Sequence, residues 1–237
     1  MSEMSQKQAF LTAEGDQYYQ RNRDKLTSIN QKAAEDRVLA SIRVLKLQPR
    51  CILEVGCSTG WRLEALRGAY SAMCYGIDPS AEGIKEGKVL FPEISLEQGT
   101  TDSLPFSEAM FDLVIFGFCL YLCDRRDLFK IAYEGDRVLK DKGYIAILDF
   151  HPTFPYQNEY KHLPGMSSYK MNYANLFSWN PAYTVASQLI FNHEEIADIS
   201  VPDERVSVSM LYKNAQYAYP EYLFTPKINR PNEQLAT

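Results

Sequence analysis

The chain has 237 residues, a formal net charge of −5 and 46% hydrophobic residues, which suits one folded domain with a sizeable core and argues against disorder. Nucleic-acid binders gather lysine and arginine to neutralise phosphates. The densest basic groups here are only Arg21 with Arg23 and Lys25, and Arg125 with Arg126, so a nucleic-acid partner is disfavoured.

The sequence also shows no pattern of a metal site or a membrane protein. The five cysteines lack the spacing of a zinc site. The first ten residues lack a signal-peptide core, and no apolar stretch approaches the roughly 20 residues of a membrane span. We therefore expect a cytoplasmic protein with reduced thiols, no metal and no membrane partner.

The N-terminal part of the chain differs in pattern from the rest. Residues 1–28 are polar and carry an aromatic cluster that includes Tyr18 and Tyr19. From Ile29 to Leu47 apolar residues recur at helix-like spacings, which predicts an amphipathic helix. We expect residues 1–48 to form an N-terminal helical cap.

Short apolar runs then alternate with segments of helical pattern. Such alternation predicts right-handed βαβ units and a parallel sheet with helices on both faces. Consecutive apolar residues, as in Leu113 to Phe116, are typical of central strands buried on both sides. The predicted strands are Cys51–Val55, Ala72–Ile77, Ile94–Gln98, Phe111–Phe116 and Tyr144–Phe150.

The segment 151–182 interrupts this alternation. It contains four prolines, many tyrosines and little periodicity, and long irregular segments inside compact domains are usually functional or disordered. Its aromatic content predicts an ordered substrate lid. Two strand-like stretches come next, Thr184–Phe191 and Arg205–Tyr212, and suggest a closing antiparallel pair. We expect a main domain over 49–220 with the lid inserted in it, and a loosely structured tail over 221–237.

The strongest local signal is the turn after the first predicted strand, from Ile52 to Gly60. A strand runs into a glycine-containing turn, and the first N–H groups of the next helix are free to bond a ligand. A dinucleotide-binding turn would read GxGxxG and place a pyrophosphate on the helix. Counted from Gly56, the second and third glycine positions hold Ser58 and Trp61. Pyrophosphate binding is therefore disfavoured, and a bulky, largely neutral cofactor remains compatible with the turn.

This turn resembles motif I of the class I S-adenosylmethionine-dependent methyltransferases, (D/E)xGxGxG, with Ser58 in place of the middle glycine. The resemblance implies that Glu54 helps to fix the turn and contacts the ammonium group of the cofactor. It also implies that Gly56, Cys57 and Ser58 give backbone contacts to the methionine portion, with Gly60 in the same cofactor-binding turn.

A second motif ends the next predicted strand at Asp78-Pro79-Ser80. A carboxylate can accept hydrogen bonds from both hydroxyls of a ribose, and Ser80 can cap the following helix. In the family this acid binds ribose, so the resemblance assigns Asp78 and the adjacent Pro79 to the cofactor. Because NAD enzymes also place an acid here, Asp78 alone does not separate the two classes of cofactor.

The loop from Gln98 to Phe106 resembles the family's loop after the third strand, often GDAxxLPF. That loop contacts adenine through a backbone N–H and a side-chain carboxylate. Because Thr100 stands where many relatives have Asp, the resemblance assigns Thr101 and Asp102 to the adenine.

The resemblance extends through residues 50–150 and implies a fold. That fold is α/β and Rossmann-like: a doubly wound, mostly parallel seven-stranded sheet with an antiparallel last strand. The fourth predicted strand also matches, which assigns Phe116 to the cofactor site and places the loop Gly117–Tyr121 beside the transferable methyl group. N-terminal segments often form lids in this family, so Tyr18 and Tyr19 either close over the cofactor or pack against the core.

Methyl transfer from a sulfonium depends mainly on aligning the acceptor and excluding water, whereas a hydroxyl acceptor also needs a base. His151 is the leading base candidate, because it follows the fifth predicted strand and ligands bind at the carboxyl ends of parallel strands. Its alternative is a loop histidine bonded to the backbone. Tyr121, His162 and Tyr169 are candidate acceptor contacts, since an aromatic-rich lid suits a ring or a sugar.

These patterns predict a methyltransferase that uses S-adenosylmethionine on a small molecule, by O-methylation of a sugar-like or natural-product metabolite. The sugar-like expectation comes from Glu14–Tyr19 and Ser168–Tyr173, which look similar to bacterial methyltransferases of surface-sugar or natural-product pathways. One alternative is an RNA methyltransferase on the same fold, which would need a basic surface. Another is a non-catalytic module that binds the cofactor without turnover. A nicotinamide oxidoreductase is disfavoured by the glycine spacing.

Overall fold

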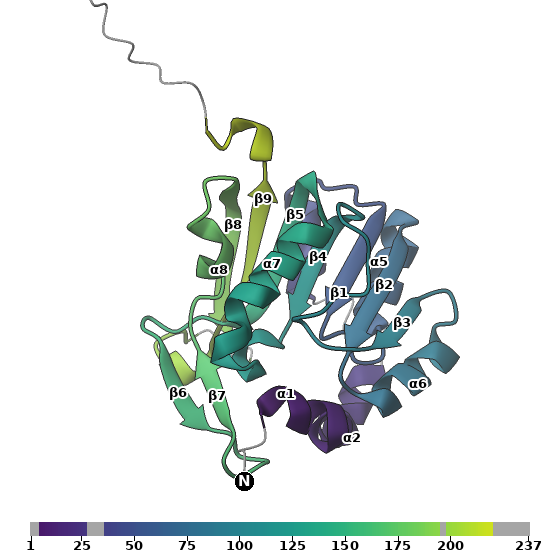
Figure 1. Ribbon diagram of the computed structural model, residues 1–237, viewed down its shortest axis with the longest axis vertical. Coiled ribbons are helices and arrows are strands. Elements are labelled where there is room, and N and C mark those ends of the chain that lie inside the picture. The colour runs from purple at the N-terminus through teal and green to yellow at the C-terminus, as the bar shows by residue number, and fades with distance from the viewer. Residues whose placement is uncertain (1–4, 28–35, 195–197, 220–237) are drawn as a thin grey trace, which may run out of the picture.

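The structure is a computed structural model that describes residues 5–27, 36–194 and 198–219. Its centre is a seven-stranded sheet in the order β3-β2-β1-β4-β5-β9-β8 (Figure 1). Only β9 runs against the other strands, since it pairs antiparallel with both of its neighbours. This confirms the predicted Rossmann-like sheet. Its strands are β1 (Cys51–Val55), β2 (Met73–Asp78), β3 (Ser95–Gln98), β4 (Phe111–Gly117), β5 (Leu139–Phe150), β8 (Tyr183–Asn192) and β9 (Arg205–Lys213).

Helices cover both faces of the sheet, and each face has its own apolar core. Alternate residues of β4 show the division, because successive side chains of a strand point to opposite faces. Leu113 and Ile115 join the core under α4, α5 and α6, whereas Val114 and Phe116 join the core under α7 and α8. The helices are α1 (Gln6–Ala9), α2 (Gly15–Thr27), α4 (Arg37–Val44), α5 (Trp61–Tyr70), α6 (Ala81–Leu90), α7 (Leu128–Val138) and α8 (Asn175–Ser178).

The insertion after β5 is more regular than its sequence suggested. It contains a two-stranded antiparallel hairpin of β6 (Tyr156–Glu159) and β7 (Ser167–Lys170), followed by α8. The hairpin strands are short and partly exposed, so their sequence lacks the apolar alternation that marks a strand. β5 also begins five residues before the predicted start, because Leu139 pairs with Phe111 across an irregularity in the register.

The N-terminal cap is a helix from Gln6 to Thr27, interrupted by one π-helical turn at Phe10–Glu14. It lies below the lower ends of the central strands in Figure 1, beside the β6–β7 hairpin. Of the helix predicted over Ile29–Leu47, the structure describes α4, which starts where Asp36 accepts a hydrogen bond from Leu39 N. The tail predicted over 221–237 lies outside the described residues.

Polar contacts attach this N-terminal helix to the body of the protein. Asp16 accepts hydrogen bonds from Ser80 Oγ at 2.7 Å and Glu82 N at 2.9 Å, at the start of α6. Gln6 donates from Nε2 to the Leu122 carbonyl at 2.7 Å, and its Oε1 accepts from Ser167 N of the hairpin. The helix therefore bridges α6, the loop after β4 and the β6–β7 hairpin.

Candidate functional site

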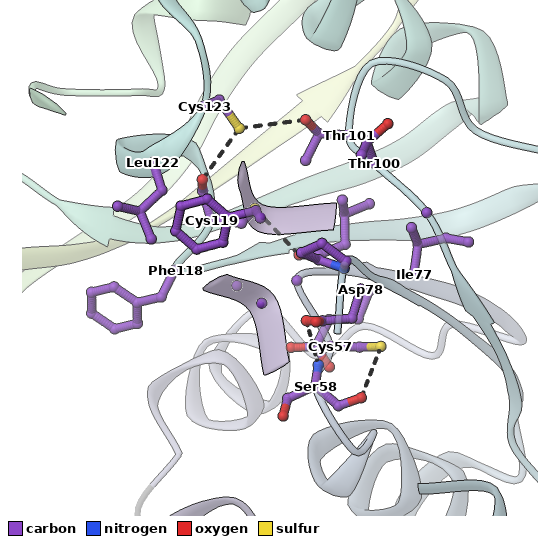
Figure 2. Close-up of a pocket in the computed structure, with 18 of the residues that line it drawn as sticks. Cys57, Ser58, Ile77, Asp78, Thr100, Thr101, Phe118, Cys119, Leu122 and Cys123 are labelled. Atoms are coloured by element: carbon purple, nitrogen blue, oxygen red, sulfur yellow. Dashed lines mark hydrogen bonds between the residues drawn. The ribbon is translucent and has the colours of Figure 1, made fainter. Parts of the chain in front are cut away.

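A cavity of about 320 Å³ lies at the carboxyl ends of β1, β2 and β4. Open α/β sheets bind ligands at this edge, and the volume is within the range of small-molecule sites. Figure 2 shows Cys57 and Ser58 of the β1–α5 turn on one side and Thr101 and Cys123 opposite, with Asp78 between them. The N-terminal helix supplies the remaining wall of the cavity through Lys7, Phe10, Gly15, Tyr18 and Tyr19.

The turn after β1 is held close to its neighbours. The N–H groups of Gly56 and Cys57 both donate to the Ile77 carbonyl, at 2.8 and 3.2 Å. Gly56 has φ +80°, and a Cβ there would lie 2.8 Å from Cys119 Cβ. Only glycine fits this left-handed backbone and this close approach without displacing a neighbour.

Two cavity-lining residues other than glycine also adopt left-handed backbone. Ser58 has φ +50°, and Phe118 in the loop after β4 has φ +51°. Such conformations cost energy in residues with a Cβ and persist where the surrounding structure imposes them, often at ligand sites. They occur here on facing walls of one cavity.

Asp78 joins the turns that follow β1 and β2. Its Oδ2 accepts a hydrogen bond from Ser58 N at 2.8 Å, and its Oδ1 accepts from Ser80 N at 2.9 Å. Burial raises the pKa of Asp78 to about 6, against the lowering effect of these two bonds. Ser80 caps α6 as predicted, because its Oγ accepts from Gly83 N at 2.9 Å.

A buried charge network lies at the floor of the cavity. Arg62 donates to Glu54 and, from Nε at 2.9 Å, to Asp36. Glu54 Oε2 is buried without a hydrogen-bond partner among the described residues. Burial raises the pKa of Glu54 to about 7, although Arg62 opposes the shift. A Cβ at Gly117 would lie 2.7 Å from Glu54 Oε1, so glycine there leaves room for the ion pair.

The opposite end of the cavity carries a second buried acid. Asp102 accepts hydrogen bonds from Lys7 at 2.8 Å, Lys130 at 3.2 Å and Thr100 Oγ1 at 2.8 Å. Burial alone would raise the pKa of Asp102, but these partners lower it to about 2. Thr101 Oγ1 lies 3.4 Å from Cys123 Sγ (Figure 2). Asp102 is thus ionised and partly neutralised by the N-terminal helix.

Both tyrosines predicted to form a lid line the cavity. Tyr18 lies near enough to Tyr121 for each to affect the other's ionisation, and burial raises the pKa of Tyr18. Tyr19 is buried and its hydroxyl bonds Glu86 of α6. Burial and this bond raise the pKa of Tyr19 to about 12. Two neighbouring tyrosines therefore face the cavity, one tied to α6 and one near the loop after β4.

Two residues assigned to the cofactor do not line the cavity. Phe116 is fully buried and its ring packs against Phe177 of α8, with centroids 6.1 Å apart. Because β4 alternates, Phe116 points into the core under α7, and Gly117 to Cys119 line the cavity in its place. The position of Phe116 gives that assignment no support. Gly60 starts α5 at φ +81° and packs against Leu96, so it shapes the turn without facing the cavity.

The candidate acceptor residues also lie outside the cavity lining. His151 is half-buried, with Nδ1 3.3 Å from Ser207 Oγ and its backbone N–H bonded to the Arg205 carbonyl. His162 is exposed and packs edge-on against Tyr160. Tyr169 lies under the guanidinium of Arg125, 4.3 Å from its ring centroid.

Tyr121, in contrast, lies beside the cavity wall. Its ring packs against Phe118, with centroids 6.4 Å apart, and against Phe150, with centroids 5.1 Å apart. Asp149, which was not predicted from the sequence, holds this loop in place, because its Oδ2 accepts from Leu120 N and Tyr121 N at 3.0 and 3.3 Å. Burial raises the pKa of Asp149 to about 7. An acid near the end of an otherwise apolar strand was the available signal.

Comparison with known proteins identifies a family model that matches part of the chain. A family model described as a methyltransferase domain matches residues 53–147. This stretch runs from β1 into β5 and contains the turns that carry Gly56, Asp78 and Asp102. Residues 53–147 are therefore similar to a methyltransferase domain, as the resemblance of these turns implied.

Proteins that are similar to part of this chain have names that describe different classes of acceptor. The chain is 29% identical over 122 residues to malonyl-[acyl-carrier protein] O-methyltransferase 1 of Coxiella burnetii. This match covers 51% of this chain and 41% of that protein. The chain is 27% identical over 103 residues to ajmaline N-methyltransferase of Rauvolfia serpentina, covering 39% and 35%. The matches thus span less than half the length of these curated relatives.

One solved structure resembles this chain over most of its length. The 1,6-didemethyltoxoflavin-N1-methyltransferase of Burkholderia thailandensis, bound to 1,6-didemethyltoxoflavin and S-adenosylhomocysteine, superposes with a TM-score of 0.66. The match covers 87% of this chain and 88% of that one at 14% identity, and it shows a common fold. Within the described residues, no three His, Cys, Asp or Glu side chains are grouped to hold a metal ion, and no helix could cross a membrane.

Proposed function

We propose that this protein transfers the methyl group of S-adenosylmethionine to a small-molecule acceptor. One observation carries the proposal: the carboxylate of Asp78 and the buried Glu54 Oε2, which has no partner in the part of the chain that the structure describes, belong to residues that line the same cavity. A buried polar atom without a partner is costly in a folded protein. A ligand that brings an ammonium group to Glu54 and a ribose to Asp78 would satisfy both.

Residues along the whole cavity have the polarity that the successive parts of S-adenosylmethionine require. Arg62 lines the cavity next to Glu54, so the pair offers opposite charges to the ammonium and carboxylate of an amino-acid tail. At the other end, Ile77 and Leu122 are buried apolar groups beside Thr101 and Asp102, as an adenine requires. Bound there, the cofactor would supply a methyl group that its positive sulfur already activates.

The chain's own groups would then orient the acceptor and exclude water. Tyr18 and Phe118 line the cavity from the N-terminal helix and the loop after β4. Asp149 fixes that loop, and Asp16 fixes the helix on the start of α6. Fixed walls favour methyl transfer because they align the reactants before reaction. Transfer to oxygen of a sugar-like or natural-product metabolite stays a prediction.

The alternative functions have less support. An RNA substrate requires a basic surface, and the chain carries a net charge of −5. A binding module without turnover would bind the cofactor equally well, so only an activity measurement separates it from an enzyme. His151 remains a predicted base, although Ser207 already occupies its Nδ1.

Calorimetry with S-adenosylmethionine and S-adenosylhomocysteine tests the cofactor, and release of S-adenosylhomocysteine in the presence of small-molecule pools tests turnover. We expect binding of both nucleosides and product formation with at least one pool. Folded protein that binds neither nucleoside would contradict the proposal, whereas binding without product from any pool would favour the non-catalytic alternative.

The pH dependence of binding should follow Glu54. Because burial raises its pKa to about 7, Glu54 is mostly protonated in the empty protein below that pH and ionised above it. An ammonium group favours the ionised form, so S-adenosylhomocysteine affinity should rise about 5- to 10-fold from pH 6 to pH 7.5, below the titration of an α-amino group. Calorimetry across this range measures it. In Glu54→Gln the affinity should be lower and the profile flatter; an equally steep profile would assign the dependence to another group.

A further inference from the structure

A polar cluster lies where the N-terminal helix meets the β6–β7 hairpin. Glu14 is 1% exposed, and its Oε1 accepts hydrogen bonds from the Tyr160 hydroxyl at 2.8 Å and from Arg21. Its Oε2 is equally buried and has no partner among the described residues. Native proteins leave few buried polar atoms unpaired, and those that remain call for a reason such as a ligand.

The chain brings this carboxylate next to the cavity. Glu14 ends the π-helical turn Phe10–Glu14, and both Phe10 and the following Gly15 line the cavity. A π-helical turn inserts one extra residue into a helix and is frequent at functional sites. Gly15 is packed so tightly that a Cβ would lie 2.6 Å from the Phe10 carbonyl and 3.1 Å from Ser80 N. The backbone beside Glu14 is thereby held against the turn after β2.

Tyrosines connect Glu14 with the wall formed by the loop after β4. Tyr160 donates a hydrogen bond to Glu14, and Tyr18, which lines the cavity, lies near Tyr121. These tyrosines are near enough to influence each other's ionisation, since Tyr160 and Tyr18 both help to raise the pKa of Tyr121, after burial. Tyr121 in turn packs on Phe118 of the cavity wall. The cluster is therefore adjacent to the part of the cavity formed by Tyr18 and Phe118.

The size of the cavity leaves this region for the acceptor. At about 320 Å³ the cavity is at the lower end of the range of single small-ligand sites, about 300 to 1,000 Å³, so it accommodates one nucleoside-sized ligand but not a second molecule. An acceptor has to reach the cofactor through a neighbouring region. The side chains of Glu14, Tyr18, Tyr121 and Tyr160 form a polar and aromatic cluster beside the cavity, in which Tyr18 lines the cavity and Glu14 and Tyr160 are buried behind it.

We propose that Glu14 Oε2 is the recognition group for the methyl acceptor, and that this acceptor is a neutral compound that presents a hydroxyl group to it. The inference rests on the proposed function and names the substrate class of the same site. Arg21 already compensates the charge of Glu14 through Oε1, so a second cation would meet repulsion, whereas a neutral O–H satisfies the free oxygen without adding charge. Glu14 acts as a positioning residue for the acceptor.

The experiment uses full-length protein, methyl-labelled S-adenosylmethionine and two pools of simple compounds: neutral sugars and polyols in one, primary amines in the other. We expect label in the neutral hydroxyl pool. Kinetics on the compound labelled there should then show KM for the acceptor raised about 10- to 100-fold in Glu14→Gln, with kcat much less affected. The dissociation constant of S-adenosylhomocysteine should stay within about twofold of wild type, because Glu14 does not hold the cofactor.

A matched variant and a second substitution keep the test decisive. Glu82→Gln alters a carboxylate of α6 that accepts a hydrogen bond from Gln20 of the N-terminal helix, away from Tyr160. This variant should leave acceptor KM unchanged. If Glu14→Gln fails to fold, Glu14→Asp retains the charge, withdraws it by one methylene and should also raise acceptor KM. Label confined to the amine pool, label in neither pool, or an unchanged acceptor KM would overturn the inference while S-adenosylhomocysteine still binds. Loss of nucleoside binding in wild type would instead contradict the proposed function.

Discussion

Replacing Asp78 by asparagine should weaken S-adenosylhomocysteine binding by about 100-fold or more. Both carboxylate oxygens accept backbone N–H bonds, from Ser58 and Ser80. An asparagine has one acceptor oxygen, so its NH₂ group would face one of these donors, and the turn would lose its geometry together with the partner proposed for the ribose. Hydrogen bonds to a charged group contribute about 1.5 to 3 kcal/mol each. Isothermal calorimetry measures the change directly.

Asp112→Asn is the matched control. Asp112 also accepts two backbone N–H bonds, from Arg50 at 3.0 Å and Cys51 at 2.9 Å, and its other oxygen accepts from Lys140 at 2.7 Å, but it stands at the opposite end of the sheet. Its replacement should lower Tm, because the ion pair with Lys140 is lost, and should leave the dissociation constant of S-adenosylhomocysteine unchanged. Equal losses of affinity in the two variants would mean that general destabilisation, and not the position of Asp78, weakens binding.

Gly56→Ala should lower both Tm and nucleoside affinity. At φ +80° a residue with a Cβ pays about 1 to 2 kcal/mol for its left-handed backbone. The new methyl group would also lie 2.8 Å from Cys119 Cβ and 2.9 Å from the Gly117 carbonyl. The turn after β1 and the loop after β4 would have to separate, which changes two walls of the cavity at once. We expect at least a 30-fold loss of affinity, on the order of the 2 kcal/mol that such strain implies.

Gly68→Ala provides the comparison on the same side of the sheet. Gly68 lies within α5, and nothing lies within 4 Å of the Cβ that alanine would add. Alanine in a helix is favoured over glycine by about 0.5 to 1 kcal/mol, so Tm should rise slightly and affinity should not change. Wild-type affinity in Gly56→Ala would show that the close approach of the two loops is dispensable.

The central sheet was predictable because its signal is local. Runs such as Leu113 to Phe116 are apolar on both faces, and only a strand covered on two sides accommodates them. The β6–β7 hairpin gave no such signal, because Gln157 and Glu159 are exposed polar residues of short strands. Its pairing depends on the N-terminal helix and the loop after β4 beside it, which no local pattern encodes.

The candidate site shows the same division. Glu54 and Asp78 could be placed near a ligand because Glu54 is the penultimate residue of β1 and Asp78 is the last residue of β2, so each stands just before the turn that follows its strand. Arg62 and Lys7 could not, since their roles depend on partners distant in the chain; Lys7 and Asp102 are 95 residues apart. Successive side chains of β4 point to opposite faces of the sheet, and this alternation directs the Phe116 ring into the core under α7.

The attachment of the N-terminal helix has a consequence for how firmly one wall of the cavity is held. Its polar anchors, such as Lys7 with Asp102 and Asp16 with Ser80, act together with the buried side chains of Ala9 and Tyr19. Moving this helix away from the sheet would break those polar contacts and expose apolar side chains to water at the same time. The wall that Tyr18 and Tyr19 form is therefore held by two different kinds of interaction, and weakening one of them leaves the other in place.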